Sequence, residues 1–179
     1  MKQFRVGIIG ATGMVGQRFA TLLENHPWFH VTALAASARS AGKTYEEAVG
    51  NRWLMQTPMP ESMKNMVIFN AEEDVDKVVS LVDFVFCAVN MDKAKIKALE
   101  ETYAKHECPV ISNNSANRAT PDVPMIIPEI NAAHAAVIPA QRKRLGTKRG
   151  FIAVKSNCSL QSYVPAIAPL MPLGVTKAL

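Results

Sequence analysis

Three stretches of this sequence carry residue types that could do chemistry. The first is a glycine-rich segment near the N-terminus, GATGMVG at 10–16. The second, VKSNCSLQSY at 154–163, places Cys158 among amides and hydroxyls. The third, SNNSANR at 112–118, ends in the lone cation Arg118. Backbone N–H groups next to glycines can bind a phosphate. A thiol can act as a covalent nucleophile, and a guanidinium can bind an anion.

The glycine-rich segment lies between an apolar run, Gln3–Ile9, and a stretch with helical spacing, Gly13–Asn25. Glycine lets backbone N–H groups approach a pyrophosphate, and the helix N-terminus adds partial positive charge. The last glycine, Gly16, would allow the helix to pack closely on the strand. A lone G-x-x-G-x-x-G is weak evidence, but between a strand and a helix it predicts a dinucleotide site, including Gly10 and Gly13. The alternative is a tight turn that binds nothing.

The end of the second predicted strand indicates which dinucleotide binds. NAD-specific sites place an acid there to accept hydrogen bonds from the ribose 2′-OH, whereas residues 35–40, AASARS, contain none. A carboxylate would repel a 2′-phosphate, and hydroxyls with a guanidinium would hold one. We therefore predict NADP, with Ser37, Arg39 and Ser40 around the 2′-phosphate and Lys43 nearby. The alternative is a polar loop with an incidental arginine.

Short-chain reductases share this glycine pattern but need a Tyr-x-x-x-Lys pair for proton transfer. The residues four positions after the three tyrosines are Val49, Glu107 and Ile167. None is lysine, so this chain cannot use that chemistry.

The three cysteines differ in their surroundings. Cys87 lies inside an apolar strand and is predicted to be core, and Cys108 precedes Pro109 at a turn without an evident partner. Cys158 follows a strand and precedes an apolar run that is helical for a turn or two before Pro165. A helix N-terminus favours the thiolate, and its N–H groups, with the Asn157 side chain, could hold an oxyanion. From the residues alone, a nucleophile and a buried small residue remain equally open.

Arg118 follows a predicted strand at its carboxyl end, where open α/β sheets bind ligands. An anion clamp is one interpretation, and a surface arginine is the commoner one.

The elements that must position these residues alternate between strand and helix. The predicted strands are Gln3–Ile9, Phe29–Ala36, Met66–Asn70, Asp83–Val89, Pro109–Asn113 and Phe151–Lys155. One helix, Gly13–Asn25, should face inward through Val15, Phe19, Leu22 and Leu23, and another, Met91–His106, through Ile96, Leu99 and Tyr103. Ser37–Pro60 is predicted to be a long loop with a short helical piece. Short apolar strands without polar alternation are typical of a parallel sheet buried on both faces, which predicts a doubly wound, Rossmann-like α/β fold.

Composition sets the remaining bounds. The 179 residues are 49% hydrophobic and 20% charged, which favours one ordered domain, or one domain plus part of another. An odd number of cysteines without a C-x-x-C pair argues against a disulfide framework and a zinc knuckle, so we expect a cytoplasmic protein without a metal site. The sequence contains no run of 18 apolar residues, so we predict no membrane span. Five of the basic residues lie in QRKRLGTKRG at 141–150, which we interpret as a solvated helix end and loop rather than a nucleic-acid site.

Five segments together resemble a known family. GATGMVG at 10–16, ASARSAGK at 36–43, SNNSANR at 112–118, VPMIIPEIN at 123–131 and SNCS at 156–159 follow one another at intervals similar to those of aspartate-β-semialdehyde dehydrogenases of the archaeal and fungal type. The resemblance implies NADPH-dependent reductive dephosphorylation of L-aspartyl-4-phosphate to the semialdehyde. That reaction serves lysine, threonine and methionine biosynthesis and, in bacteria, diaminopimelate biosynthesis.

The resemblance also implies roles for individual residues. Cys158 would form an acyl-thioester, Asn157 and backbone N–H groups would support the oxyanion, and Arg118 would bind the substrate phosphate. The cofactor residues implied are Thr12, Gly13, Met14 and Val15 at the pyrophosphate, Arg39 and Ser40 at the 2′-phosphate, and Asn90 and Ser115 at strand ends nearby. Glu129 and Asn131 match the family pattern without an assigned role.

The sequence departs from the family pattern in two respects. Ser156 stands where proline often precedes the Asn-Cys pair. The family's acid/base histidine, substrate glutamine and carboxylate-binding arginine lie farther beyond the cysteine than Leu179, and neither Gln161 nor any of His26, His30, His106 and His134 matches them. We therefore predict an NADP-binding domain at 1–150 and the beginning of a catalytic and dimerisation α+β domain at 151–179. This part alone should be inactive, and the complete enzyme a homo-oligomer.

Other readings stay open at this point. N-acetyl-glutamyl-phosphate reductase and malonyl-CoA reductase use the same plan of a cysteine thioester and NADPH. A catalytically inactive NADP-binding fragment belongs to a different class, as does an RNA-binding protein that uses the basic segment.

Overall fold

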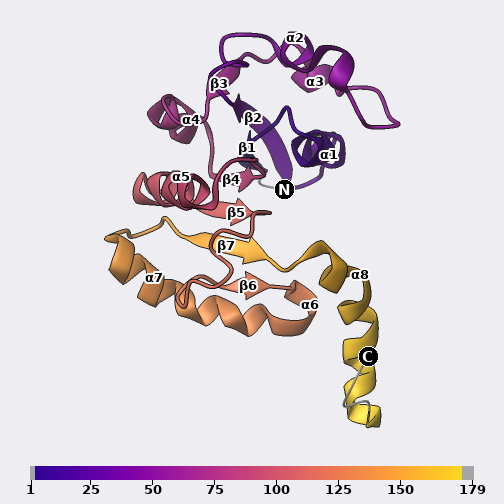
Figure 1. The fold of residues 1–179 in the computed structure, drawn as a ribbon, viewed down its shortest axis with the longest axis vertical. Coiled ribbons are helices and arrows are strands. Elements are labelled where there is room, and N and C mark those ends of the chain that lie inside the picture. The colour runs from indigo at the N-terminus through magenta and orange to yellow at the C-terminus, as the bar shows by residue number, and fades with distance from the viewer. Residues whose placement is uncertain (1–2, 175–179) are drawn as a thin grey trace.

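The computed structural model of the chain describes residues 3–174, and its centre is one parallel sheet (Figure 1). Seven strands lie in the order β3-β2-β1-β4-β5-β7-β6, and every pairing is parallel. The strands are β1 (Phe4–Ile9), β2 (Phe29–Ala36), β3 (Ile68–Asn70), β4 (Phe84–Cys87), β5 (Val110–Ser112), β6 (Met125–Ile126) and β7 (Ile152–Lys155). The predicted doubly wound α/β fold is confirmed.

Helices cover both faces of the sheet, with α4, α5 and α7 on one side and α1 on the other (Figure 1). The helices are α1 (Met14–Leu23), α2 (Tyr45–Val49), α3 (Glu61–Lys64), α4 (Val75–Leu81), α5 (Lys93–Lys105), α6 (Pro128–Asn131), α7 (Ile138–Leu145) and α8 (Cys158–Ile167), with 3₁₀ turns η1 (Gly50–Arg52), η2 (Ala132–Val137) and η3 (Ala168–Leu173). Within residues 3–174, no helix combines the length and apolar character that a membrane crossing requires.

Two cores explain why the strands are apolar on both faces. Along β2, Ala33 and Ala35 pack with α4 and α5, whereas Leu34 and Ala36 pack with α1 and α2. Alternate side chains of one strand thus enter opposite cores, which explains why this strand is apolar at successive positions. The inward positions predicted for α5 (Ile96, Leu99 and Tyr103) are all buried.

The rotation of α1 differs from the prediction at one position. Leu22, expected to face inward, is 56% exposed, and the buried positions are Gly16, Gln17, Ala20 and Leu23. A Cβ on Gly16 would lie 2.2 Å from the carbonyl oxygen of Gly10, so the helix backbone rests directly on the glycine loop at this point. That contact fixes residues 16, 20 and 23 as the inner stripe and turns Leu22 outward.

The strand that follows residue 150, where we predicted a second domain to begin, belongs to the same sheet. β7 lies inside the sheet between β5 and β6, with Val110 opposite Ile152 and Met125 opposite Val154. The sheet therefore extends to Lys155. Beyond it, α8 and η3 lead away from the sheet (Figure 1) and contain no buried residue. A second domain that begins there remains a prediction.

Candidate functional site

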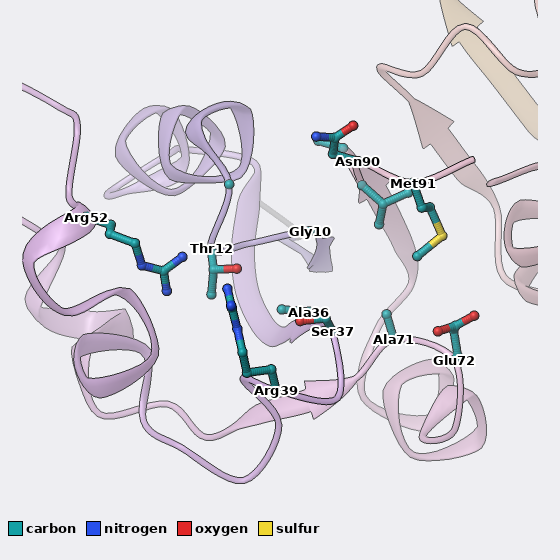
Figure 2. A pocket seen from close by; sticks show the side chains of 13 residues that line it. Gly10, Thr12, Ala36, Ser37, Arg39, Arg52, Ala71, Glu72, Asn90 and Met91 are labelled. Carbon is teal, nitrogen blue, oxygen red and sulfur yellow. The ribbon is translucent and has the colours of Figure 1, made fainter. Parts of the chain in front are cut away.

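A cavity of about 330 Å³ opens at the carboxyl ends of the central strands (Figure 2). It is lined by Gly10, Thr12, Gly13, Ala36, Ser37, Arg39, Arg52, Ala71, Glu72, Ala88, Val89, Asn90 and Met91. The fold therefore brings together six residues that the sequence assigned to the cofactor: Gly10, Thr12, Gly13, Ser37, Arg39 and Asn90. This is the edge at which doubly wound sheets bind ligands.

The glycine loop at the cavity is held tightly against the sheet. Gly10 has a φ of +88°, and a Cβ there would lie 2.5 Å from the carbonyl oxygen of Ala88. The N–H groups of Gly10 and Ala11 both donate to the carbonyl oxygen of Ala35, at 2.8 and 3.1 Å. The loop thus turns back over β2 and aims the start of α1 at the cavity.

Gly13 differs from Gly10 and Gly16 because the surrounding chain leaves room for a side chain at this position. A Cβ would lie 3.5 Å from the nearest atom, at an ordinary φ of −80°. Gly13 is the N-cap of α1, has no side-chain cap, and is followed by no acid in the first turn. The N-terminal N–H groups therefore stay open to an anionic ligand.

The four other predicted cofactor residues lie outside the cavity lining. Met14 is largely exposed and Val15 half-buried in the first turn of α1, so only their backbone N–H groups can face a phosphate. Ser40 is buried, and its N–H donates to the carbonyl oxygen of Ser37 at 2.8 Å. Ser115 is exposed beyond β5 and is not among the lining residues.

The cavity also contains residues that sequence reasoning missed. Arg52, from η1, and Glu72, after β3, lie on opposite walls (Figure 2). Arg52 lies in the segment predicted to be a long loop, and Glu72 comes two residues after the predicted strand Met66–Asn70. A usable signal was present only for α2, where Thr44 and Glu47 form a capping box.

Cys158 begins α8, as predicted, and is the exposed one of the three cysteines. Asn157 is the N-cap: its Oδ1 accepts from the N–H of Ser159 at 2.9 Å and lies 3.6 Å from the Cys158 Sγ. Burial raises the pKa of the other two thiols, that of Cys108 to about 12. The helix also continues through Pro165, two residues beyond it, rather than ending before it.

Arg118 is not the free surface charge that its sequence context suggested. Its Nε donates to the carbonyl oxygen of Lys155 at 3.1 Å, and its Nη2 to those of Ser156 and Asn113 at 3.3 and 3.4 Å. The guanidinium thus joins the end of β5 to the turn that leads into Cys158. Any anion bound by Arg118 would lie beside that turn.

A buried carboxylate that the sequence analysis missed supports the loop of Arg118. Glu100 of α5 is 1% exposed and accepts from the Ser112 hydroxyl, from Asn114 Nδ2 at 3.1 Å and from Asn117 Nδ2 at 2.7 Å. Glu100 is four residues after Ile96 and three before Tyr103, both inward-facing. Its position on that stripe was the available signal.

Lys155 is a second missed residue near the thiol. Its Nζ donates to the carbonyl oxygen of Ser156 at 3.1 Å. Partial burial, together with the nearby Arg118 charge, lowers the pKa of Lys155. Two cations therefore lie near the turn before Cys158, an arrangement that suits an anionic substrate.

The basic segment at 141–150 is largely engaged within the chain. Arg144 bonds to Asp122 and Glu101, and Arg149 donates to the carbonyl oxygens of Asp83 and Glu107. The Glu107 carboxylate accepts the N–H groups of residues 148–150, which lowers its pKa to about 2. These contacts support the interpretation as a helix end and loop.

Comparisons with known proteins agree with this geometry. The chain is 42% identical over 166 residues to the aspartate-semialdehyde dehydrogenase of Aspergillus fumigatus, covering 93% of this chain and 44% of the relative. It is 40% identical over 174 residues to that of Archaeoglobus fulgidus, covering 97% and 48%. The chain thus spans about half the length of the curated relatives it matches.

A solved structure matches over the same part. The aspartate semialdehyde dehydrogenase of Candida albicans with NADP superposes with a TM-score of 0.81 at 33% identity, covering 96% of this chain and 48% of that one. The family model described as "Semialdehyde dehydrogenase, NAD binding domain" matches residues 5–138. The family resemblance of the sequence is thereby confirmed, and the chain belongs to the semialdehyde dehydrogenase NAD-binding-domain family.

Proposed function

We propose that the protein is an NADP-dependent aspartate-semialdehyde dehydrogenase in which Cys158 is the nucleophile. The observation that carries the proposal is the position of this exposed thiol at the start of α8, on the same sheet edge as the glycine-loop cavity. The relatives' names point to aspartate semialdehyde, and the family resemblance of the sequence implies L-aspartyl-4-phosphate as the substrate that is reduced to it.

The topology connects the cavity to the thiol. In the order β1-β4-β5-β7, β7 lies three strands from β1, or roughly 14 Å at the usual strand spacing. Ser37 and Arg39 mark the adenosine end at β2, so the nicotinamide end extends the other way. It would pass Asn90 and Ser115, at the ends of β4 and β5, on its way to Cys158.

The proposed reaction begins at the Cys158 thiolate, the form in which a cysteine is nucleophilic. Its sulfur bonds to the acyl carbon, backbone N–H groups and the Asn157 amide hold the oxyanion, and the bond to the phosphate oxygen breaks. Phosphate leaves with the electron pair and takes up a proton. Arg118 Nη1, which has no hydrogen-bond partner among residues 3–174, would hold that phosphate.

Bound NADPH supplies a hydride to the resulting thioester. The carbon–sulfur bond then breaks, the aldehyde leaves, and Cys158 returns as thiolate. Ser37 and Arg39, with no acid beside them on the adenosine side of the cavity, support NADP as the cofactor. We also propose that the complete protein forms a homo-oligomer. A location in the reducing cytoplasm is proposed as well, because all three cysteines are unpaired.

The test is NADPH oxidation by the native protein with aspartyl phosphate, with Cys158→Ala as the variant and Ser162→Ala, elsewhere on α8, as the control. Cys158→Ala should lose at least about 10³-fold in turnover, as expected for loss of a covalent nucleophile, and still bind NADPH. Normal turnover by this variant would refute the proposal. Faster turnover with N-acetyl-glutamyl phosphate or malonyl-CoA would reassign the substrate.

A further inference from the structure

We infer that Arg52 is a second guanidinium that binds the 2′-phosphate of the dinucleotide, and that buried Gln17 positions it. The inference rests on the proposed binding of NADP. It adds a specificity residue to a site in which Arg39 was the predicted partner of that phosphate.

Arg52 lines the same cavity as Thr12 and Arg39, although it comes from η1 rather than from the glycine loop or the end of β2. Figure 2 shows the Arg52 and Arg39 guanidinium groups both pointing towards Thr12. Asn90 and Met91 lie on the other side of the cavity, in the direction proposed for the nicotinamide. The two cations thus converge at the adenosine end.

The charges of this part of the cavity are not balanced by the chain. Neither Arg39 nor Arg52 forms an ion pair among residues 3–174. Arg52 Nη2 donates to the carbonyl oxygen of Ala48 at 2.5 Å, which neutralises no charge. Glu72 lies across the cavity, beside Ala71 (Figure 2). Two like charges on one wall repel each other, and a phosphate monoester with nearly two negative charges would relieve that repulsion.

The 2′-phosphate fits this position better than the pyrophosphate does. The pyrophosphate belongs at the glycine loop and the N-terminal N–H groups of α1. In this fold, the ribose of the adenosine binds at the end of the second strand, which here is Ala36 and Ser37. Arg39 follows two residues later, and its side chain points towards Thr12 (Figure 2). A guanidinium that meets Arg39 there would contact the 2′-substituent of that ribose.

Gln17 fixes the backbone position of Arg52 through hydrogen bonds made in the interior of the protein. Gln17 is 1% exposed, and its Nε2 donates to the carbonyl oxygens of Thr12 and Arg52 at 3.1 and 3.0 Å. Its Oε1 accepts from the N–H of Leu54 at 2.8 Å. One buried amide therefore ties residues 52–54 to the glycine loop, and both of its N–H donors and its oxygen take part.

A second anchor supports the same arrangement. The buried hydroxyl of Tyr45, in α2, donates to the carbonyl oxygen of Ala11 at 2.9 Å. Residues 45–54 are thus fixed to the glycine loop at both ends. Gln17 is accordingly a positioning residue, and Arg52 is the residue that it presents to the ligand.

The test compares dissociation constants of NADPH and NADH for the purified native protein, Arg52→Ala, Arg52→Lys and the control Arg18→Ala. Arg18 is an exposed cation of α1 outside the cavity lining. Arg52→Ala should weaken NADPH roughly 10- to 100-fold, the range for a lost charge-assisted hydrogen bond, and NADH by less than about twofold. Lysine should restore part of the affinity, since it keeps the charge and loses the fork. Arg18→Ala should change neither.

Binding of adenosine 2′,5′-bisphosphate and of AMP isolates the contact with the 2′-phosphate, because only the first ligand carries that group. Arg52→Ala should bind adenosine 2′,5′-bisphosphate more weakly than the unaltered protein does, and AMP equally well. Gln17→Met should reproduce the NADPH defect, and Gln17→Met with Arg52→Ala should be no worse than Arg52→Ala alone. Equal losses of NADPH and NADH in Arg52→Ala, or no loss, would overturn the inference while leaving NADP binding intact. Equal affinity of the unaltered protein for NADPH and NADH would instead overturn the proposed cofactor.

Discussion

Replacing Glu100 by glutamine tests whether a buried carboxylate organises the loop that carries Arg118. Both Glu100 oxygens accept hydrogen bonds, from the Ser112 hydroxyl, Asn114 Nδ2 and Asn117 Nδ2. Glutamine keeps the shape but replaces one acceptor oxygen with an NH₂ group. The serine hydroxyl can rotate to accept from that group, whereas an asparagine NH₂ cannot.

In either orientation, therefore, the glutamine NH₂ faces one asparagine NH₂. Asn117 cannot simply turn over, because its Oδ1 already accepts from the Thr120 hydroxyl at 3.1 Å, and turning Asn114 over would give up the hydrogen bond from its Nδ2 to Cys87 Sγ at 3.4 Å. A buried donor left without an acceptor costs about 1–3 kcal/mol. We expect Glu100→Gln to lower the free energy of unfolding by that amount.

Urea unfolding of the native protein measures the change, with the next residue as control. Glu101 is also a carboxylate of α5, but it pairs with Arg144 at the surface, at 3.0 Å. Glu101→Gln should cost no more than about 1 kcal/mol. If Glu100→Gln costs no more than Glu101→Gln, Glu100 does not hold the loop by its two oxygens, and the reasoning fails.

Other predictions concern the loops and the thiols. The pKa of Glu107 is about 2 in the fold, below its ordinary value, so its contribution to stability is present above pH ~4.5 and lost as the pH falls towards ~2; Glu107→Gln should flatten the acid limb of Tm against pH. Gly16→Ala should destabilise the protein by about 1–3 kcal/mol, since its Cβ would lie 2.2 Å from a carbonyl oxygen. Gly13→Ala, with its nearest atom at 3.5 Å, should unfold at nearly the unaltered urea midpoint yet bind NADPH more weakly. Iodoacetamide followed by mass mapping should label Cys158 in the native protein and leave both buried thiols unmodified.

Features that depend on neighbours in the chain could be predicted from the sequence. The first strand, the glycine loop and the first helix follow one another within about 20 residues, and the tight packing of Gly16 on Gly10 and Ala11 arises within that unit. The helix start at Cys158 is likewise local, because Asn157 supplies its own cap. In these places, the residue type and its immediate neighbours determine the conformation.

Features that depend on contacts between distant segments could not be predicted. Gln17 meets Arg52 thirty-five residues later, and nothing in the spacing of either residue indicates the partner. The place of β7 between β5 and β6 is decided by strand pairing, so an apolar strand after residue 150 looked like the beginning of another domain.

A test of Arg118 must separate its structural contacts from its proposed binding of phosphate. The sequence presented a lone cation, yet the guanidinium already donates to three carbonyl oxygens at the ends of β5 and β7. Arg118→Ala would therefore free the turn before Cys158 as well as remove a phosphate partner, and a loss of activity alone would not distinguish them. The rate of Cys158 alkylation reports on the turn, whereas the KM for phosphate in the reverse reaction reports on the anion. A residue that only binds phosphate would change the second and leave the first unaltered, and the observed contacts predict that Arg118→Ala changes both.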